Sequence, residues 1–425
     1  MKRYDAIVIG GGPAGSMSAC LLARAGWSVI LVEKTAFPRR KVCGEFISAP
    51  ALALLARAGF ADDVLDVAGP EIRELAVYAG ERIITGPMPR GETPIEYGRA
   101  LGREHLDTLL LDRARAGGVE ILQPWRVTAC RPIADAYAVE AKSSSDAAEL
   151  VAPVVIDAHG SWEAGVYPGS TIRERQAGSD LFAFKAHFSA GALPTRRMPL
   201  LAFPGGYGGL VTSDGGRMSF SCCVRRDALK AFRTAAPGSS AGNAVFAHVS
   251  RTCRGFREAA EAAVREGPWL AAGPLQPGIR FTSHDGCFAV GNALGEAHPI
   301  VAEGISMALQ SAWLLCERLV AAPRSLRGSA WNAVARDYEA AYRANFAQRI
   351  AASRAFAAAA MRPSAAGAVA HVLQGAPGLL AFGARWAGKV APLAFGSGCH
   401  SAALRPVNVS EENQGFPPKP PFLAP

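Results

Sequence analysis

Three glycines near the N-terminus have the spacing that binds a dinucleotide pyrophosphate. Gly10, Gly12 and Gly15 match G-x-G-x-x-G, with Pro13 and Ala14 between the last two. The first glycine permits a tight turn, the second lets the backbone approach a pyrophosphate, and the third lets a helix pack close to a strand. The helix N-terminus then offers unpaired N–H groups to the phosphate charge.

A carboxylate follows where a ribose is normally held. An apolar run, 4–9, precedes the glycines, and Ser28–Val32 predicts a second strand that ends at Glu33, eighteen residues after Gly15. An acid at this place hydrogen-bonds the ribose diol and disfavours a 2′-phosphate. The agreement of strand, turn, helix, second strand and acid favours a dinucleotide site over a turn that binds no ligand. The acid favours FAD or NAD over NADP.

Length and composition exclude several classes. The chain has 425 residues, half of them hydrophobic, which suits two or three domains. Nine cysteines show no C-x-x-C spacing, so we expect no metal, no disulfide framework and a reducing cytoplasm. The net charge of +9 is spread in short clusters, so no nucleic-acid partner is expected. The surplus favours anionic cofactors or a membrane surface.

Membrane spans and targeting segments are not predicted. Ala6–Ile9 is too short for the core of a signal peptide. Ser364–Ala384 carries no formal charge, but Gly375-Ala376-Pro377-Gly378 breaks it. We interpret it as a buried or interfacial helical pair rather than a span. The prediction is a cytoplasmic protein, with peripheral membrane contact as the open alternative.

The segment after Glu33 carries a second pattern, Pro38-Arg39-x-Lys41-x-Cys43-Gly44-Glu45. With the glycine fingerprint and a later glycine motif, it resembles the geranylgeranyl-reductase-like flavoproteins, which are related to the flavin aromatic hydroxylases and flavin halogenases. The resemblance spans roughly residues 1–320 and implies FAD, with the Cys-Gly loop near the flavin ring. Lys34, Lys41, Cys43 and Gly44 are therefore candidate cofactor contacts. The alternative for Cys43 is a half-buried packing residue.

The later glycine motif resembles the second flavin motif of that family, usually G-D-A…P…G-x-G-I. Its candidate contacts are Gly291, Asn292, Pro299, Gly304 and Ile305. Asn292 replaces the acid that normally holds the ribityl chain, and its amide can still donate and accept hydrogen bonds. A helix beginning near Gly304 would aim its N–H groups at the flavin N1–C2 edge and stabilise the reduced, anionic form. Two motifs about 280 residues apart favour FAD over an NAD-only dehydrogenase.

Two further residues are weighed for cofactor contact. Arg103 opens an amphipathic helix that ends at Gly117-Gly118. In the resembling family an arginine at the start of this helix approaches the cofactor, so Arg103 is a candidate contact. The alternative is that Arg103 is a solvent-exposed charge at the helix end with no role in binding. Relatives often carry an acid before the glycine at position 160. Here His159 stands there, and we favour a role in the turn over a cofactor contact.

The middle of the chain changes to short strand-like runs from Leu181 onward, which resembles the antiparallel substrate sheet of the family. Tyr207 stands where reductases of the family often have the tyrosine of Y-x-W-x-F-P, and Gly209 replaces the tryptophan. Tyr207 is therefore the candidate substrate residue. The departure at Gly209 argues against a geranylgeranyl substrate and predicts room for a different or wider molecule.

The predicted fold is α/β, with a Rossmann-like FAD-binding domain, an inserted antiparallel β-sheet substrate domain and a C-terminal helical region. The FAD-binding domain takes residues 1–75, 98–165 and 280–325, and the substrate domain takes 76–97 and 166–279. Residues 326–400 form the helical region, and 401–425 form a loose, Pro-rich tail. Single elements are expected at Val151–His159, a buried strand, and at Asn243–Ala263, a helical pattern.

The sequence predicts an FAD-dependent oxidoreductase that acts on a hydrophobic small molecule. A reductase would pass hydride from reduced flavin to a C=C bond, with Cys43 as the candidate catalytic proton donor. A monooxygenase would use reduced flavin to activate oxygen in a dry pocket and hydroxylate an aromatic or polyketide-like ring. A non-catalytic flavin-binding protein is the third hypothesis. NADH or NADPH would dock transiently as the donor, because no separate NADPH-binding domain is predicted.

Two related classes are set aside. A halogenase should show W-x-W-x-I-P, and no two of the seven tryptophans are two residues apart. A quinone-linked electron-transfer protein would need an iron–sulfur cluster, for which the cysteine spacing offers no ligands.

Overall fold

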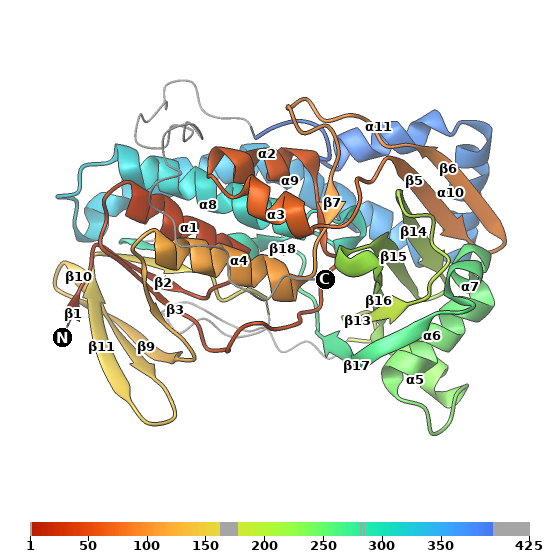
Figure 1. Cartoon of the computed structure of the whole chain (residues 1–425), viewed down its shortest axis with the longest axis horizontal. Coiled ribbons are helices and arrows are strands. Elements are labelled where there is room, and N and C mark those ends of the chain that lie inside the picture. The colour runs from red at the N-terminus through yellow and green to blue at the C-terminus, as the bar shows by residue number, and fades with distance from the viewer. Residues whose placement is uncertain (1, 162–176, 281–282, 284, 394–425) are drawn as a thin grey trace.

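The computed structural model describes residues 2–161, 177–280, 283 and 285–393. At one end of the molecule five parallel strands form a sheet in the order β19-β12-β2-β3-β8 (Figure 1). The strands are β2 (Ala6–Ile9), β3 (Val29–Val32), β8 (Glu120–Leu122), β12 (Val154–Asp157) and β19 (Cys287–Ala289). All residues of β2, β3 and β12 are buried, as in parallel sheets that are covered on both faces.

Helices cover one face of this parallel sheet, and a second sheet covers the other. The helices are α1 (Pro13–Arg24), α4 (Arg103–Ala116) and α8 (Gly304–Ala321). The second sheet has the order β1-β11-β10-β9, with strands Lys2–Arg3 (β1), Arg126–Ile133 (β9), Ala136–Lys142 (β10) and Ala147–Ala152 (β11). Because strand side chains alternate, Ala6 and Val8 pack toward the helices while Ile7 and Ile9 pack toward the second sheet.

At the other end of the molecule stands a seven-stranded sheet, in the order β17-β13-β16-β15-β14-β5-β6 (Figure 1). Its strands are β5 (Glu74–Ala79), β6 (Arg82–Pro87), β13 (Leu181–Ser189), β14 (Arg197–Phe203), β15 (Gly206–Thr212), β16 (Met218–Arg225) and β17 (Val264–Ala272). Neighbours are antiparallel except for β14 and β5. We call it the substrate sheet, after the role that the family resemblance predicts for it.

Three helices cover the outer face of the substrate sheet, namely α5 (Arg226–Thr234), α6 (Ala241–Thr252) and α7 (Arg254–Ala260). Three more follow at the C-terminal end, α9 (Asn332–Ala360), α10 (Pro363–Gly375) and α11 (Gly378–Trp386). The aromatic residues Tyr338, Tyr342 and Phe346 of α9 are buried in the core of the parallel-sheet region. Helices α10 and α11 pack on β5 and β6.

Short elements complete the described chain. They are α2 (Ala49–Arg57), α3 (Ala61–Val67), the pair β4 (Phe46–Ile47) with β7 (Arg99–Ala100), the pair β18 (Gly278–Ile279) with β20 (Gly295–Glu296), and the 3₁₀ turns Asp214–Gly216, Gly291–Ala293, Pro299–Val301 and Gly328–Trp331.

The predicted fold class is confirmed, and several details differ from the prediction. The run Val151–His159 is not one strand, because Pro153 has no N–H to donate and separates β11 from β12, which belong to different sheets. The pattern over Asn243–Ala263 breaks into α6 and α7 at Cys253, whose backbone is extended. The substrate sheet contains one parallel pair. The predicted tail, 401–425, lies outside the described residues.

Candidate active site

A cavity of about 520 Å³ lies between the carboxyl ends of the parallel strands and the substrate sheet. This is where open parallel sheets bind ligands. Predicted contacts that line it are Gly12, Pro13, Ala14, Lys41, Cys43, Gly44, Arg103, Tyr207, Gly291, Asn292, Pro299, Gly304 and Ile305. The structure thus brings both glycine motifs, the Cys-Gly loop and the substrate sheet to one space.

The glycine-rich turn has separate structural and ligand-facing positions. Gly10 has a φ of +106°, and a Cβ at Gly15 would overlap the Gly10 carbonyl oxygen, so both glycines are needed for the turn itself. A Cβ at Gly12 would meet only Arg103 Nη2, at 3.7 Å, among the described residues. Gly12 is the N-cap of α1 and lines the cavity. The space in front of it therefore fits a bound pyrophosphate.

Glu33 lies behind the turn and is 3% exposed. Its carboxylate accepts hydrogen bonds from the backbone N–H groups of Gly11, at 2.7 Å, and Thr35, at 2.8 Å. It therefore fixes the turn; it is not among the residues that line the cavity, and its role at a ribose stays a prediction. Lys34 is exposed and does not line the cavity, so of the loop residues predicted as contacts it is the one the structure does not bring there.

Arg103 places a fixed positive charge beside Gly12. It is 7% exposed and binds Asp107 through two hydrogen bonds, of 2.7 and 2.8 Å. Burial alone would lower the pKa of Arg103, but the Asp107 carboxylate outweighs it and raises that pKa above its ordinary value. The alternative of a solvated helix-end charge is therefore wrong. A buried guanidinium at a helix N-terminus suits a diphosphate.

Lys41 adds a second cation whose charge is easily lost. It lines the cavity, and its Nζ would lie 3.3 Å from a Cβ at Gly160. Burial, followed by the neighbouring Arg103 and Arg39, lowers the pKa of Lys41 to about 8. An ammonium with this pKa can bind an anion or give up a proton near neutral pH.

The late glycine motif supplies polar groups at another wall of the cavity. Asn292 Nδ2 donates to Ser161 Oγ at 2.7 Å, and it lies 3.4 Å from Glu296 Oε1. Glu296 Oε2 is buried with no hydrogen-bond partner among the residues that the structure describes. Burial raises the pKa of Glu296 to about 7. An unsatisfied buried carboxyl oxygen beside Asn292 fits a hydroxyl-bearing chain such as ribityl.

The N-terminus of α8 also reaches the cavity. Gly304 is its first residue, and a Cβ there would meet no described atom within 4 Å. The preceding Glu303 is turned away and binds Ser48 and Lys389, each at 3.1 Å. The N–H groups at the start of α8 thus face the cavity, which is the arrangement predicted for the electron-rich edge of a flavin.

Tyr207 and His298 are neighbouring side chains in the cavity wall. The Tyr207 hydroxyl lies 3.3 Å from His298 Nδ1. Burial raises the pKa of Tyr207 well above its ordinary value, whereas burial and Arg354 lower that of His298 to about 4. At neutral pH the hydroxyl is therefore protonated and the imidazole is neutral. His159, by contrast, pairs with Asp157 in its own turn, at 2.5 Å.

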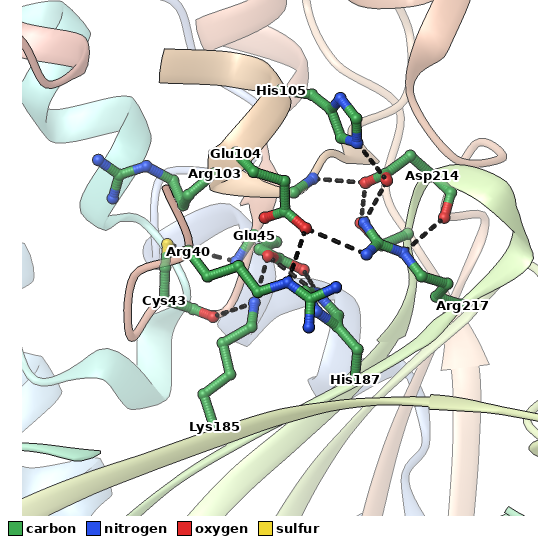
Figure 2. Close-up of polar contacts among 12 residues, drawn as sticks. Arg40, Cys43, Glu45, Arg103, Glu104, His105, Lys185, His187, Asp214 and Arg217 are labelled. Atoms are coloured by element: carbon green, nitrogen blue, oxygen red, sulfur yellow. Dashed lines mark hydrogen bonds and ion pairs between the residues drawn. The ribbon is translucent and has the colours of Figure 1, made fainter. Parts of the chain in front are cut away.

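A buried ion cluster ties the Cys43 loop to the substrate sheet (Figure 2). Glu45 binds Lys185 Nζ and His187 Nε2, the latter at 2.9 Å, and all three side chains are 1% exposed. Lys185 also donates to the Cys43 carbonyl oxygen, at 3.0 Å. Cys43 itself is half-buried, and its Sγ accepts the Glu45 N–H at 3.4 Å. Glu45 and Lys185 therefore set where the thiol stands.

A second set of ion pairs joins α4 to the same sheet (Figure 2). Glu104 accepts a hydrogen bond from Arg217 at 3.0 Å and lies 3.4 Å from Arg40. Asp214 accepts the Gly102 N–H at 2.6 Å and lies 3.3 Å from His105. The loop, the helix that carries Arg103 and the substrate sheet are thus held in one charged network.

Sequence reasoning missed several of these residues as site residues, namely Glu45, Ser161, Lys185, His187, Glu296 and His298. Lys185 and His187 had a usable signal, because they stand two apart in the apolar run Leu181–Ser189. Ionisable groups on one face of a buried strand require partners. Nothing local identifies their partner, since Glu45 is 142 residues from His187.

Comparisons with known proteins agree with this geometry. Residues 3–166 match the family model described as FAD binding domain. Menaquinone reductase of Mycobacterium tuberculosis is 32% identical over 118 residues, 28% of each chain. Geranylgeranyl diphosphate reductase of Rhodobacter capsulatus is 35% identical over 122 residues, again 28% of each chain. The flavin-dependent brominase Bmp2 superposes with a TM-score of 0.72 at 18% identity, covering 91% of this chain and 94% of the other.

These matches confirm an FAD binding domain and the predicted resemblance to FAD-dependent reductases and halogenases. The chain matches less than a third of the length of the two curated reductases. The likeness to Bmp2 establishes the common fold over most of the chain. The halogenases, set aside on their missing tryptophan motif, are therefore relatives in fold.

We expect Gly12→Val to abolish FAD binding without unfolding the chain. The added side chain would meet only the tip of Arg103 within the described structure, but it would fill the space before α1. Losing even one charged hydrogen bond to the pyrophosphate, about 1.5–3 kcal/mol, weakens binding at least about tenfold. Flavin content and apoprotein melting temperature should be measured together. Gly15→Ala is the contrast, since its clash with Gly10 should destabilise the apoprotein; unchanged flavin in Gly12→Val would show a purely structural turn.

Glu45→Gln should lower the free energy of unfolding by about 3–5 kcal/mol, because Lys185 would remain buried without its counter-charge. The control is Asp227→Asn, which breaks the more exposed Arg225–Asp227 pair and should cost about 1 kcal/mol or less. Urea denaturation measures both. Equal losses in the two variants would contradict the importance of the buried cluster.

The same cluster should make stability pH-dependent. Burial alone would raise the pKa of Glu45, but Lys185 and His187 outweigh it and hold that pKa below its ordinary 4.5. A lowered folded-state pKa stabilises above the unfolded value and loses this effect as the pH falls toward the folded value. Below about pH 4.5 the wild-type protein should therefore lose stability more steeply than Glu45→Gln. Parallel unfolding curves at acid pH would argue otherwise.

Proposed function

We propose that this chain is an FAD-dependent reductase that adds a hydride and a proton across a C=C bond of a hydrophobic molecule. The observation that carries the proposal is the single cavity that joins the pyrophosphate turn to an apolar wall of the substrate sheet. FAD, when bound and reduced, supplies the hydride. NADH or NADPH is the proposed source of that hydride. The reductases that match in sequence are named for menaquinone and geranylgeranyl diphosphate, which both carry isoprenoid chains.

The chain's own residues divide the work of binding. The N-terminus of α1 and Arg103 hold the diphosphate, while Asn292 and Glu296 hold hydroxyl groups between the two ends of the cavity. The apolar wall binds the substrate and excludes water; it includes Leu75, Val77, Leu200, Leu210, Val211 and Leu275. Gly208 and Gly209 also line the cavity and keep side-chain bulk out of it, which suits a substrate wider than a single prenyl chain.

The proton must reach the carbon that does not receive hydride. Cys43 is the proposed catalytic donor: its S–H bond breaks, the proton forms the new C–H bond, and the thiolate regains a proton from solvent. The Glu45 N–H, 3.4 Å from Sγ, stabilises the thiolate that remains. Tyr207 is the competing donor, because its raised pKa keeps the hydroxyl protonated. Its O–H bond would break to form the new C–H bond, and the phenolate would regain a proton from solvent, while His298 Nδ1, 3.3 Å away, positions the hydroxyl.

A monooxygenase is the second candidate function, favoured by the likeness to Bmp2 over 91% of the chain. The same apolar wall would then keep water away while oxygen reacts, and an electron-rich ring would occupy the substrate side. This alternative needs no proton donor on the substrate sheet. A flavin-binding protein without turnover is the remaining possibility, and it would leave both Cys43 and Tyr207 without a chemical role.

Cys43→Ala should slow the substrate step about 10²- to 10⁴-fold, the usual contribution of a general acid. Flavin content and reduction by NADH or NADPH should stay normal, because the Cys43 thiol is proposed to act on the substrate alone, after the flavin has been reduced. Cys43→Ser should fall between the wild type and Cys43→Ala. Tyr207→Phe is the matched variant: a larger loss there would move the proton donor to the Tyr207–His298 pair. Wild-type turnover in both would favour the monooxygenase.

The purified protein should be yellow, release FAD rather than FMN on denaturation, and be bleached by NADH or NADPH without oxygen. Admitting oxygen then separates the two chemistries. Slow reoxidation that does not depend on an aromatic substrate supports the reductase. Fast, substrate-stimulated oxygen consumption supports the monooxygenase. A protein that releases only FMN, or that no donor reduces, contradicts the proposed function.

A further inference from the structure

Helices α10 and α11 carry an unusually apolar outer surface. Of the large hydrophobic side chains exposed in the described chain, most lie here: Val369, Val372, Leu379, Phe382 and Trp386, with Phe356 at the end of α9. Phe382 is 66% exposed and Val372 is 56% exposed. The opposite faces of the two helices are anchored, since Ala370 and Leu380 pack with the substrate sheet. We call these six exposed residues the α10–α11 surface.

The bend between α10 and α11 distinguishes this pair from a straight membrane-spanning helix. No single described helix is long and apolar enough to cross a membrane, whereas α10 and α11 together pass that test but bend by 117°. In Figure 1 they lie side by side at the end of the molecule away from the N-terminus, over β5 and β6. A bent, anchored pair of this kind is suited to lie at a membrane surface.

The segment 340–393 carries only basic formal charges, and two of its cations are paired with carboxylates from elsewhere: Arg385 lies 3.8 Å from Glu92, and Lys389 lies 3.1 Å from Glu303. Residues 340–393 contain no Asp or Glu, and their cations are Arg343, Arg349, Arg354, Arg362, Arg385 and Lys389. Arg362 is exposed at the N-cap of α10, and Arg385 is exposed in the last turn of α11. Apolar side chains flanked by cations complement a bilayer that contains anionic lipid, and Trp386 is of the type enriched at the lipid–water interface.

The surface is continuous with the cavity. Val369, Leu379 and Phe356 are exposed and also line it, as do the inner residues Ala366, Leu373 and Gly383. Apolar residues of the α10–α11 surface and of the substrate wall thus line the same cavity. A molecule with a long hydrocarbon part could move along it without entering water.

We propose that the α10–α11 surface docks on a bilayer containing anionic phospholipid, with the mouth of the cavity facing the lipid. Docking rests on the exposed apolar residues and on the basic side chains of residues 340–393, Arg362 among them. The consequence that the substrate is a membrane-dissolved lipid rests in addition on the proposed function. A second copy of this chain is the competing occupant of the same surface.

The test is sedimentation of the purified, flavin-loaded full chain with vesicles of phosphatidylcholine alone or with about one-third phosphatidylglycerol. Binding is expected only to the anionic vesicles and should weaken as salt is raised. The double variant Phe382→Ser/Val372→Ser should bind at least about tenfold more weakly, because two apolar side chains no longer enter the lipid. Arg362→Gln should weaken binding about fivefold, as expected for one interfacial cation.

Matched controls lie far from this surface. Val264 is 62% exposed at the start of β17, and Arg233 is exposed on α5, so Val264→Ser and Arg233→Gln should bind vesicles as the wild type does. Failure of the wild type to bind anionic vesicles, or equal binding by the double variant, overturns the proposal. The proposal is also overturned if the wild type is a dimer, the double variant is a monomer, and both bind vesicles equally. Vesicle binding by a protein that reduces no C=C bond would refute the proposed function and leave docking intact.

Discussion

The buried carboxylate of Glu45 is the interaction on which the arrangement of the two sheets depends. A lone carboxylate in this position would cost several kcal/mol, because it has lost its water. Lys185 and His187, which project from a strand of the substrate sheet, supply its ionisable partners within the described cluster. The loop that follows β3 can therefore sit in the interior only while the substrate sheet is docked. The cavity lies between this loop and the sheet, and residues of both line it.

That constraint explains how chemistry at one end of the cavity meets apolar binding at the other. The loop carrying Glu45 also carries Lys41 and Cys43, so a single pairing with the substrate sheet fixes a cation toward the nucleotide end and a thiol between the ends. The network of Glu104 with Arg217 and Arg40 fixes α4 in the same frame, and α4 brings Arg103 beside Gly12. The Cys43 loop, α4 and the glycine-rich turn are thus positioned relative to one another by contacts with the substrate sheet.

Much of the FAD-binding end of the cavity could be predicted from sequence, because residues close together in the chain determine its turn and helix starts. The spacing of Gly10, Gly12 and Gly15 determines the turn, and a helix start predicted at Arg103 is where α4 begins. The strand limits of Leu181–Ser189 were also predictable, since an apolar run ends there. The ion cluster was not, because the pairing of Glu45 with Lys185 depends on a docking between distant segments. The Asn243–Ala263 break at Cys253 and the parallel β5–β14 pair likewise reflect tertiary packing.

Two ionisable groups of the cavity, Lys41 and Glu296, have pKa values shifted toward their uncharged forms, and a suitable ligand would reduce both shifts. Lys41 has a lowered pKa because it is buried near Arg103 and Arg39, and Glu296 has a raised pKa because burial outweighs the nearby Arg280 and Lys41. One oxygen of Glu296 also has no hydrogen-bond partner among the described residues. A diphosphate beside Arg103 would neutralise the repulsion on Lys41 and favour its charged form. Hydroxyl groups donating to Glu296 would favour its ionised form in the same way. The protein surroundings therefore disfavour the charged forms of Lys41 and Glu296. A ligand that is anionic at one end and carries hydroxyl groups along its middle would favour those charged forms. That pattern of charge and hydroxyl groups matches FAD better than a simple nucleotide, and it leaves the apolar remainder of the cavity for the substrate.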